Sequence, residues 1–346
     1  MNLSVIESTP ALKESFIQFN KELYNERQTA AIQAGYKWTL QEHPESIRHL
    51  IALSHDEIIG QIILYPVRCF YQSKINNCVF AYDYIVRPDY LNTGVGVKLL
   101  SKTIKSHIHF GIGVSDISKK LHLILKEKSI GDIYKFLFIK NAFSYVYAGV
   151  NTYLKITLRK LPGREKFDDS IHIEKLQAVK KNGLPQVVTA WNQDVIEFER
   201  SGQFDDLRFG SFANKYIHYH IYDSKKNLQG YFVLRREIWR GMRVLMVSDY
   251  RMAAKNEEVV DFICTASKIL MKKNKMDAVL FGSSLQWLDK KLIQHHFKKV
   301  GLPSEIFTNL MLEEGWEKRV RDRNIIMATP ADSDFEFNLG NELWKN

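Results

Sequence analysis

The order of apolar and polar positions divides the chain into alternating helical and extended segments. In the first half, apolar residues at helical spacing predict helices over 10–26, 95–108 and 118–128. Runs rich in β-branched and aromatic residues predict strands over 58–72, 78–86, 110–114 and 143–158. Strands interleaved with helices indicate an α/β fold of the α+β type, built around a mixed sheet.

A second set of elements follows a polar segment that contains Pro162 and Gly163. The segment 161–170 is the best linker candidate, so we expect domains over 1–160 and 171–346. In the second half the pattern predicts helices over 184–200, 257–273 and 286–299. It predicts strands over 215–222, 228–236, 243–250, 278–282, 306–312 and 325–328.

The two halves share an ordered set of landmarks. Asp83-Tyr84 ends one predicted strand and Asp249-Tyr250 another; a helix follows each, and then a Phe-Gly strand at Phe110 or Phe281. The separations are similar, because Asp83 to Phe110 is 27 positions and Asp249 to Phe281 is 32. This repeat predicts a tandem architecture produced by duplication.

Composition adds a preference for anionic ligands. The 346 residues carry 49 Lys and Arg against 39 Asp and Glu, a formal charge of +10 that is spread along the chain. No zinc-finger or RNA-binding motif is present, so we do not expect nucleic acid as a partner. We expect a cytoplasmic protein with buried, reduced thiols, since its three cysteines form no metal-spaced pair and we find no signal peptide or membrane segment.

The most informative segment runs from Val86 to Leu100. A strand ends at Pro88, a turn contains Asn92, Gly94 and Gly96, and a helix begins there. Free N–H groups at a helix N-terminus bind anions, and glycines let the backbone approach a phosphate closely. The segment therefore predicts a site for a diphosphate, whereas a bare Gly-x-Gly is also found in ordinary turns.

The wider frame V-x-P-x-Y-x-x-x-G-x-G-x-x-L-L resembles the GNAT acetyltransferase superfamily. The matching residues are Val86, Pro88, Tyr90, Gly94, Gly96, Leu99 and Leu100. Two positions depart from the pattern: Leu91 stands where the family has Arg, and Asn92 where it has the first Gly. The departures remove a side-chain cation from the diphosphate but leave the N–H groups in place.

The resemblance implies acetyl-CoA, or another acyl-CoA, as co-substrate of the first domain, with no metal. The implied cofactor-binding residues are Ile85, Val86, Leu91, Asn92, Thr93, Gly94, Val95, Gly96 and Ser115. A backbone N–H near Ile85 or Val86 would stabilise the oxyanion. Ser115 has two interpretations, a contact to the cofactor or a cap of the following helix.

Two residues are candidates for proton transfer. Asp83, three residues before Val86, is a candidate base for the acceptor amine; the alternative is a structural carboxylate. Many family members carry a Tyr on the next helix that protonates the thiolate. Here that helix has no Tyr, and His122 is the candidate; the alternative is a packed histidine.

The second domain has AAKNEEVV in place of the loop, with Glu257 and Glu258 where an anion would bind, so we expect it not to bind CoA. It would instead have a structural or acceptor-side role. Tyr84 and Arg208 are the candidates for contacts to the acceptor, and core packing is the alternative for the aromatic segment around Arg208.

The leading interpretation is an acyl-CoA-dependent N-acyltransferase acting on a small amine, such as an amino sugar or nucleotide sugar of a bacterial surface polysaccharide. Two alternatives stay open. One is an aminoacyl-tRNA-dependent transferase of the peptidoglycan-bridge type, and the other is a non-catalytic CoA-binding sensor or scaffold.

Overall fold

The computed structural model describes residues 3–23, 47–141, 143–144, 146, 149–150, 166–185, 195–200, 202–209, 216–239, 241–253 and 255–332. Within these residues, no helix combines the length and apolarity needed to cross a bilayer.

The chain forms two compact units that are not consecutive halves. Unit 1 contains Met1–Cys69, Lys74–Ile130 and Glu305–Trp316, and unit 2 contains Phe70–Ser73, Gly131–Ser304 and Glu317–Asn346. The sequence placed the division at 161–170, of which 161–165 lie outside the described residues. By contacts, the chain passes between units at 130/131 and returns to unit 1 for residues 305–316.

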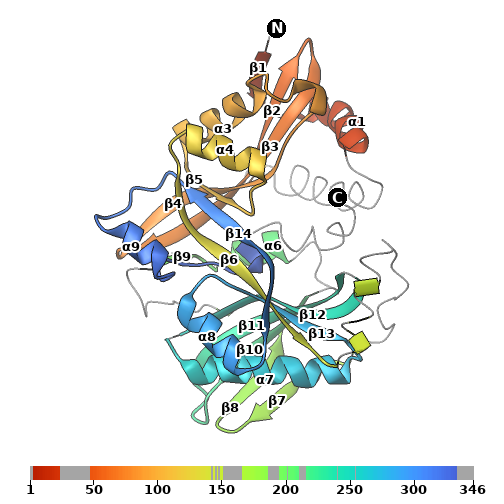
Figure 1. The fold of residues 1–346 in the computed structure, drawn as a ribbon, viewed down its shortest axis with the longest axis vertical. Helices are drawn as coiled ribbons and strands as arrows, with labels where there is room; N and C mark the ends of the chain where they lie inside the picture. The colour runs from red at the N-terminus through yellow and green to blue at the C-terminus, as the bar shows by residue number, and fades with distance from the viewer. Residues whose placement is uncertain are drawn as a thin grey trace. The chain divides into compact units, whose positions relative to one another are not determined.

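Unit 1 is a sheet with helices on both faces (Figure 1). Its elements are β1 (Leu3–Glu7), η1 (Pro10–Leu12), α1 (Lys13–Leu23), β2 (Arg48–Ser54), β3 (Glu57–Tyr71), β4 (Lys74–Val86), η3 (Pro88–Tyr90), α3 (Val95–Ser106), β5 (Ile108–Ile112), α4 (Asp116–Ile124) and the end of β14 (Lys298–Thr308). The strands lie in the order β1-β2-β3-β4-β5-β14.

Alternation along the strands decides which helix covers which face. Phe16 and Phe19 of α1 pack with Ile51 and Ile58, whereas α3 packs against the neighbouring positions, including Leu50 and Ile59. Successive side chains of a strand point to opposite faces, so α1 and α3 cover opposite sides of the sheet. Helices α3 and α4 are side by side on one of these faces (Figure 1).

The parallel strands β4 and β5 separate before β4 ends. Their pairing runs from Cys78↔Ile108 to Ala81↔Gly111, and β4 continues to Val86. Beyond Ala81 this edge of β4 no longer pairs with β5, so its N–H and C=O groups face the gap between the two strands.

Unit 2 has its own strands and helices. They are β6 (Lys128–Ile139), β7 (Ser170–Ile173), β8 (Leu176–Lys181), β9 (Ile196–Phe198), α6 (Gly202–Arg208), β10 (Tyr216–Tyr222), β11 (Leu228–Trp239), β12 (Met242–Met252), α7 (Glu257–Lys273), β13 (Ala278–Ser283), α8 (Gln286–Gln294), the start of β14, α9 (Trp316–Arg321), β15 (Ile326–Met327) and η5 (Pro330–Asp332). Its central strands lie in the order β6-β13-β12-β11-β10-β8-β7, and α7 and α8 pack on them in one large apolar core.

The series β12-α7-β13-α8-β14 reproduces β4-α3-β5-α4-β6, with a parallel pair in each unit. The strand that follows each series is exchanged. β6 follows α4 but pairs with β13, and β14 follows α8 but its end pairs with β5, as Ile306↔Ile112 to Thr308↔Phe110. The two repeats therefore complete each other's sheets.

Most predicted elements are confirmed, but several differ. The helix predicted over 286–299 ends at Gln294, because His296 adopts φ 61° and β14 begins at Lys298. The helix predicted over 118–128 ends at Ile124, because Lys126 adopts φ 61° and the Glu127 N–H bonds the His122 carbonyl. The described residues among 143–150 are helical rather than extended. The helix predicted over 184–200 lies largely outside the described residues, but its end, Ile196–Phe198, is a strand.

Candidate functional site

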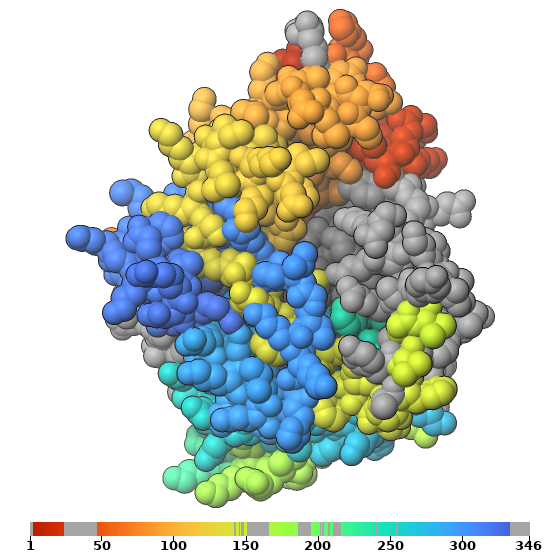
Figure 2. Space-filling view, viewed as in Figure 1, coloured from red at the N-terminus to blue at the C-terminus, as the bar shows by residue number. Residues whose placement is uncertain are grey.

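A cavity of about 340 Å³ opens in unit 1 where β4 and β5 separate. We call it the β4–α3 cavity. Its lining comes from the end of β4, the turn before α3 and the first turns of α3 and α4: Tyr84, Ile85, Val86, Tyr90, Leu91, Asn92, Gly94, Gly96, Val97, Ser115, Ile117, Ser118 and Leu121. The surface over the two helices is the orange-to-yellow region of Figure 2.

The turn before α3 has the backbone that its sequence demands. Asn92 has φ 65° and Gly94, the N-cap of α3, has φ 86°, both in the left-handed region. The Thr93 hydroxyl donates to the Tyr90 carbonyl at 2.7 Å, which holds the turn in place. No side chain caps α3, so the N–H groups of its first turn remain for a ligand.

Gly96 is required by packing. A Cβ at this position would lie 2.7 Å from the Tyr84 Oη atom and 3.0 Å from the Leu121 Cδ1 atom. The Tyr84 hydroxyl is buried, with no hydrogen-bond partner among the described residues. Burial and the negative Glu127 raise the pKa of Tyr84 well above its usual range, so its hydroxyl stays protonated.

Ser115 caps α4 and also lies on the wall of the cavity. Its side-chain oxygen accepts the Ser118 N–H at 3.2 Å. Its hydroxyl hydrogen is not used in the cap, so it can donate to a ligand.

Among the described lining residues, none carries a charge. Leu91, which stands where the family has Arg, lines the cavity and is 40% exposed. Arg87, which follows the lining residue Val86, is paired with Glu22 at 3.2 Å and with Glu57. An anion in this cavity would therefore be held by backbone N–H groups and hydroxyls.

The backbone of β4 presents an N–H group to the gap beside β5. The Arg87 N–H donates to the Ile59 carbonyl of β3 at 2.9 Å, so it points to the β3 side. N–H groups alternate in direction along a strand, so that of Val86 points to the gap. Thr93 and Val95, the other predicted members of this set, lie in the turn and first turn of α3 but are not part of the lining.

Asp83 lies at an irregularity of β4 and is half-buried. Its φ is 49°, which a non-glycine residue rarely adopts, and its carboxylate accepts a hydrogen bond from the Gln61 side-chain amide. The residue next to it, Tyr84, lines the β4–α3 cavity, whereas Asp83 is not part of that lining.

The structure places His122 in the interior, 1% exposed, rather than on the cavity wall. Its Nδ1 atom bonds Glu127 Oε2, and His109 Nδ1 bonds Glu127 Oε1 at 2.8 Å. The His122 ring also stacks on His109 and on Phe307 of β14. Burial opposes the charge of Glu127, but the hydrogen bonds from both histidines outweigh it and lower its pKa.

The sequence analysis did not predict that Glu127 and His109 contact His122. Glu127 follows the end of α4, and His109 lies on the preceding strand, β5. Among the described residues, these three side chains also place their metal-ligating atoms within 4.8 Å of one another. Each Nδ1 atom already bonds a carboxylate oxygen, so hydrogen bonding accounts for the cluster without an ion.

Arg208 is buried in unit 2, 5% exposed, and its Nη2 atom donates to the Pro330 carbonyl at 3.4 Å. The aromatic residues of this segment pack together in an apolar cluster, which contains Phe204, Phe209 and Tyr216. The structure therefore places this segment in the core, which is the alternative that the sequence left open.

The N-terminus of α7, the counterpart of α3, is closed by its own side chains. Asn256 accepts the Glu258 N–H at 2.9 Å, and the first turn carries Glu257 and Glu258. Two carboxylates at this end neutralise the helix dipole and disfavour an anion. That this turn does not bind CoA stays a prediction.

Comparisons with known proteins agree with the fold. Residues 11–117 match the model of the acetyltransferase (GNAT) family. No curated protein sequence matches the chain. A GCN5-related N-acetyltransferase from Kribbella flavida shares the fold at 12% identity and TM-score 0.56, over 89% of this chain and 72% of that one.

Two further solved structures extend the likeness beyond the first unit. N-myristoyltransferase of Saccharomyces cerevisiae with bound myristoyl-CoA matches at 10% identity and TM-score 0.54, over 88% of this chain and 82% of that one. A tandem GNAT protein from the clavulanic acid biosynthesis pathway matches at 9% identity and TM-score 0.53, over 89% and 98%.

The family model covers the first part of unit 1, and the solved structures show that most of the chain has the fold of these acetyltransferases, among them a tandem GNAT protein.

Proposed function

We propose that the chain is an acyl-CoA-dependent N-acyltransferase whose co-substrate binds in the β4–α3 cavity. The observation that carries the proposal is the uncapped N-terminus of α3, which opens on this cavity beside the free edge of β4. A helix N-terminus binds a diphosphate, and an unpaired strand edge binds the amides of an extended chain. Acyl-CoA has both groups.

The lining residues suit these two parts of the molecule. The N–H groups of Gly96 and Val97 would hold the diphosphate, and the hydroxyl of Ser115 supplies a further donor. The apolar side chains of Ile85, Ile117 and Leu121 would cover the pantetheine arm. Its acyl group would then lie near the point where β4 and β5 separate.

The reaction proposed is direct attack of an amine on the thioester carbonyl, so that the enzyme acts mainly by positioning the two reactants. The Val86 N–H, which points to the gap, would donate to the developing oxyanion. Asp83 would accept the proton that the amine loses, directly or through water. The Gln61 amide fixes the orientation of this carboxylate.

The acceptor is proposed to be a small amine, with an amino sugar as the first class to test. The protein would be titrated with acetyl-CoA by calorimetry, and CoA-thiol release would then be followed across a panel of amines. We expect binding that the substitution Gly94→Glu abolishes, together with amine-dependent release of thiol. Loss of neither in Gly94→Glu would exclude this cavity as the site.

A second candidate function is a non-catalytic CoA-binding sensor. It is favoured by the absence of charged side chains from the described lining and by the burial of His122 with Glu127. Binding of acetyl-CoA without thiol release to any amine would support it. Stabilisation by aminoacyl-tRNA but not by CoA would instead support the transferase of the peptidoglycan-bridge type.

A further inference from the structure

The parallel strands of unit 2 separate at the same place as those of unit 1. The β12–β13 pairing ends at Val247↔Phe281, two residues before Asp249. The β4–β5 pairing ends at Ala81↔Gly111, two residues before Asp83. The repeat thus creates a second gap of the kind that forms the β4–α3 cavity, between the ends of β12 and β13.

That second gap is filled by the chain itself. Residues 323–332, here called the C-terminal strap, run along it, and every residue from Ile325 to Asp332 is buried. Ile326 and Met327 form β15, which pairs in parallel with β9. The strap is therefore an integral part of the core of unit 2.

On the β13 side, the strap bonds the end of the strand and the start of α8. The Ser284 hydroxyl donates to the Ile326 carbonyl at 2.8 Å and accepts the Ala328 N–H at 2.8 Å. The Gln286 N–H, in the first turn of α8, donates to the Arg323 carbonyl at 3.0 Å. In unit 1 the corresponding first turn, that of α4, lines the β4–α3 cavity.

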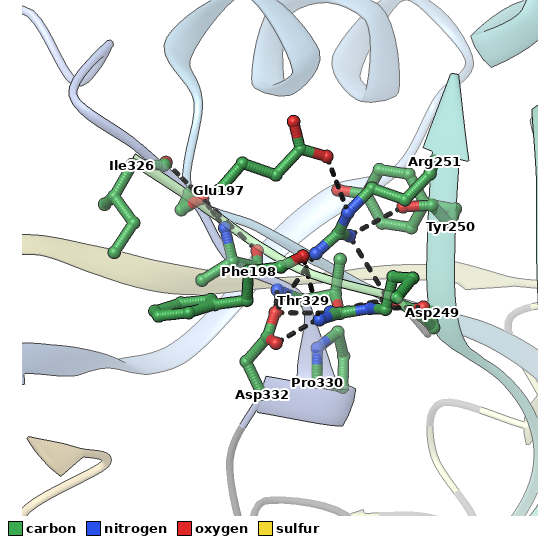
Figure 3. A network of polar contacts seen from close by, with 12 residues as sticks. Glu197, Phe198, Asp249, Tyr250, Arg251, Ile326, Thr329, Pro330 and Asp332 are labelled. Atoms are coloured by element: carbon green, nitrogen blue, oxygen red, sulfur yellow. Dashed lines mark hydrogen bonds and ion pairs between the residues drawn. The ribbon is translucent and has the colours of Figure 1, made fainter. Parts of the chain in front are cut away.

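On the β12 side, the strap is held by a buried network of charges (Figure 3). Thr329 donates to Asp249 at 2.6 Å, and Asp332 accepts from Arg200 at 2.7 Å. Arg200 also binds both carboxylate oxygens of Asp249, at 2.9 and 3.1 Å. Burial opposes the charge of Asp249, but Arg200 and Arg251 lower its pKa far below the usual range, so it stays ionised.

The middle of the strap leaves no space at the centre of the gap. Pro330 packs on Gly282 of β13, where a Cβ would lie 2.7 Å from two of its ring atoms. Gly282 corresponds in the repeat to Gly111, at which the β4–β5 pairing ends. The side chain of Tyr250 completes the contact, since its hydroxyl donates to the Gly282 carbonyl at 2.9 Å.

We infer that the C-terminal strap is a built-in occupant of the second acyl-CoA gap, so that the chain has a single acyl-CoA site, in unit 1. This rests on the proposed function for the identity of the ligand. The occupancy of the gap by the strap rests on the contacts above alone. In this view unit 2 keeps the acyltransferase fold as a scaffold, and the strap replaces the ligand that would otherwise support its separated strands.

Hydrogen exchange on the full-length protein, with and without acetyl-CoA, tests the inference. In the free protein we expect slow exchange in 325–332 and 282–286, as for a packed core. Saturating acetyl-CoA should slow exchange at 84–97 and 115–121 and leave 249–251, 282–289 and 323–332 unchanged. Fast exchange of the strap in the free protein, or ligand-dependent protection in 282–289, would overturn the inference.

The design separates this inference from the proposed function. A strap that exchanges slowly in a protein that shows no response anywhere to acetyl-CoA would reject the function and retain the occupied gap. Calorimetry gives an independent check: the expected stoichiometry is one acetyl-CoA per chain, falling to zero in Gly94→Glu. Two sites per chain, or binding in Gly94→Glu that slows exchange at 282–289, would show that the gap of unit 2 accepts ligand.

Discussion

The hydroxyl of Tyr84 lies directly against Gly96, so close that the Cβ of any other residue there would fall 2.7 Å from the oxygen. Both residues line the β4–α3 cavity. The contact joins the end of β4 to the first turn of α3, and it makes the shape of the cavity depend on the absence of a side chain at Gly96.

Gly96→Ala should therefore change the cavity without unfolding the protein. Overpacking of this kind costs about 1–3 kcal/mol, because Tyr84 or Leu121 must move. We expect the affinity for acetyl-CoA to fall about tenfold, measured by calorimetry. Ser101→Ala, on the same helix but outside the cavity lining, should bind like the parent protein; equal affinity for all three would show that this contact does not shape the site.

Two substitutions at Gly94 distinguish the effect of backbone strain on binding from the effect of charge. Its φ of 86° is accessible to Asn but unfavourable for Glu, at a cost of roughly 1–2 kcal/mol. Gly94→Glu also places a carboxylate where the diphosphate would bind. We expect Gly94→Glu to abolish acetyl-CoA binding and Gly94→Asn to retain most of it; a comparable loss in both would mean that conformation, rather than charge, limits binding.

The two repeated aspartates should respond differently to the same change. Asp83→Asn keeps the shape of a half-buried side chain and removes the proposed base, so turnover should fall roughly 100-fold. The loss should be greatest at low pH, where least of the amine is unprotonated, while acetyl-CoA affinity stays unchanged. Turnover equal to that of the parent at every pH would assign Asp83 a structural role.

Asp249→Asn should act on stability instead. It removes the charge that Arg200 and Arg251 pair with in a fully buried network, a loss of about 3–5 kcal/mol. Urea unfolding measures it. A midpoint unchanged from that of the parent would show that the network is not needed for the stability of unit 2.

A buried histidine should make the stability of unit 1 depend on pH. Burial lowers the pKa of His49 to about 4, below its ordinary value of 6.5. As pH falls from 6.5 to 4, the unfolded chain binds this proton first, so about 3 kcal/mol of stability is lost. His49→Leu should remove that part of the fall, seen by urea unfolding at pH 7 and 4.5.

Two other histidines must be considered when this measurement is interpreted. Burial also lowers the pKa of His109, so both proteins share a further fall in the same direction. The exposed His172 provides the control, since His172→Gln should keep the pH dependence of the parent. A parallel fall in His49→Leu and the parent would contradict the assignment to His49.

Asn309, in the segment that the second repeat returns to unit 1, should stabilise that unit. Its side chain accepts the His109 N–H at 2.7 Å and donates to the Ile104 and His107 carbonyls at 3.1 and 2.9 Å. Asn309→Ala leaves these backbone groups without partners, at about 1–3 kcal/mol for each that stays buried. We expect a lower thermal midpoint and weaker acetyl-CoA binding, with the exposed Asn324→Ala as the unchanged control.

Local features of the site follow from the sequence. The left-handed turn at Asn92 and Gly94, the helix that begins at Val95 and the cap at Ser115 each depend on residues within a few positions. The helical and strand patterns of the repeat are local in the same sense. Most of these elements could therefore be predicted before any tertiary contact was known, although the strand over Lys128–Ile139 was not.

Features that depend on distant pairing could not be predicted. No pattern within β6 or β14 shows that each strand pairs in the sheet of the other repeat. His122 forms a hydrogen bond with Glu127 because the chain turns after α4 at Lys126, which has a left-handed backbone. The sequence does not indicate this helix end, since Lys rather than Gly or Asn stands there. The contacts of the strap also depend on distant residues, since Thr329 meets its partner Asp249 across 80 positions.

The exchange of β6 and β14 has a consequence for the history of this protein. Once each copy had given its last strand to the other, neither could be discarded, replaced or inherited separately. A repeat that no longer bound a ligand would then be retained for as long as the other repeat was under selection. If unit 2 binds no ligand, as inferred above, the exchanged strands would still keep it in the protein, because unit 1 needs the end of β14.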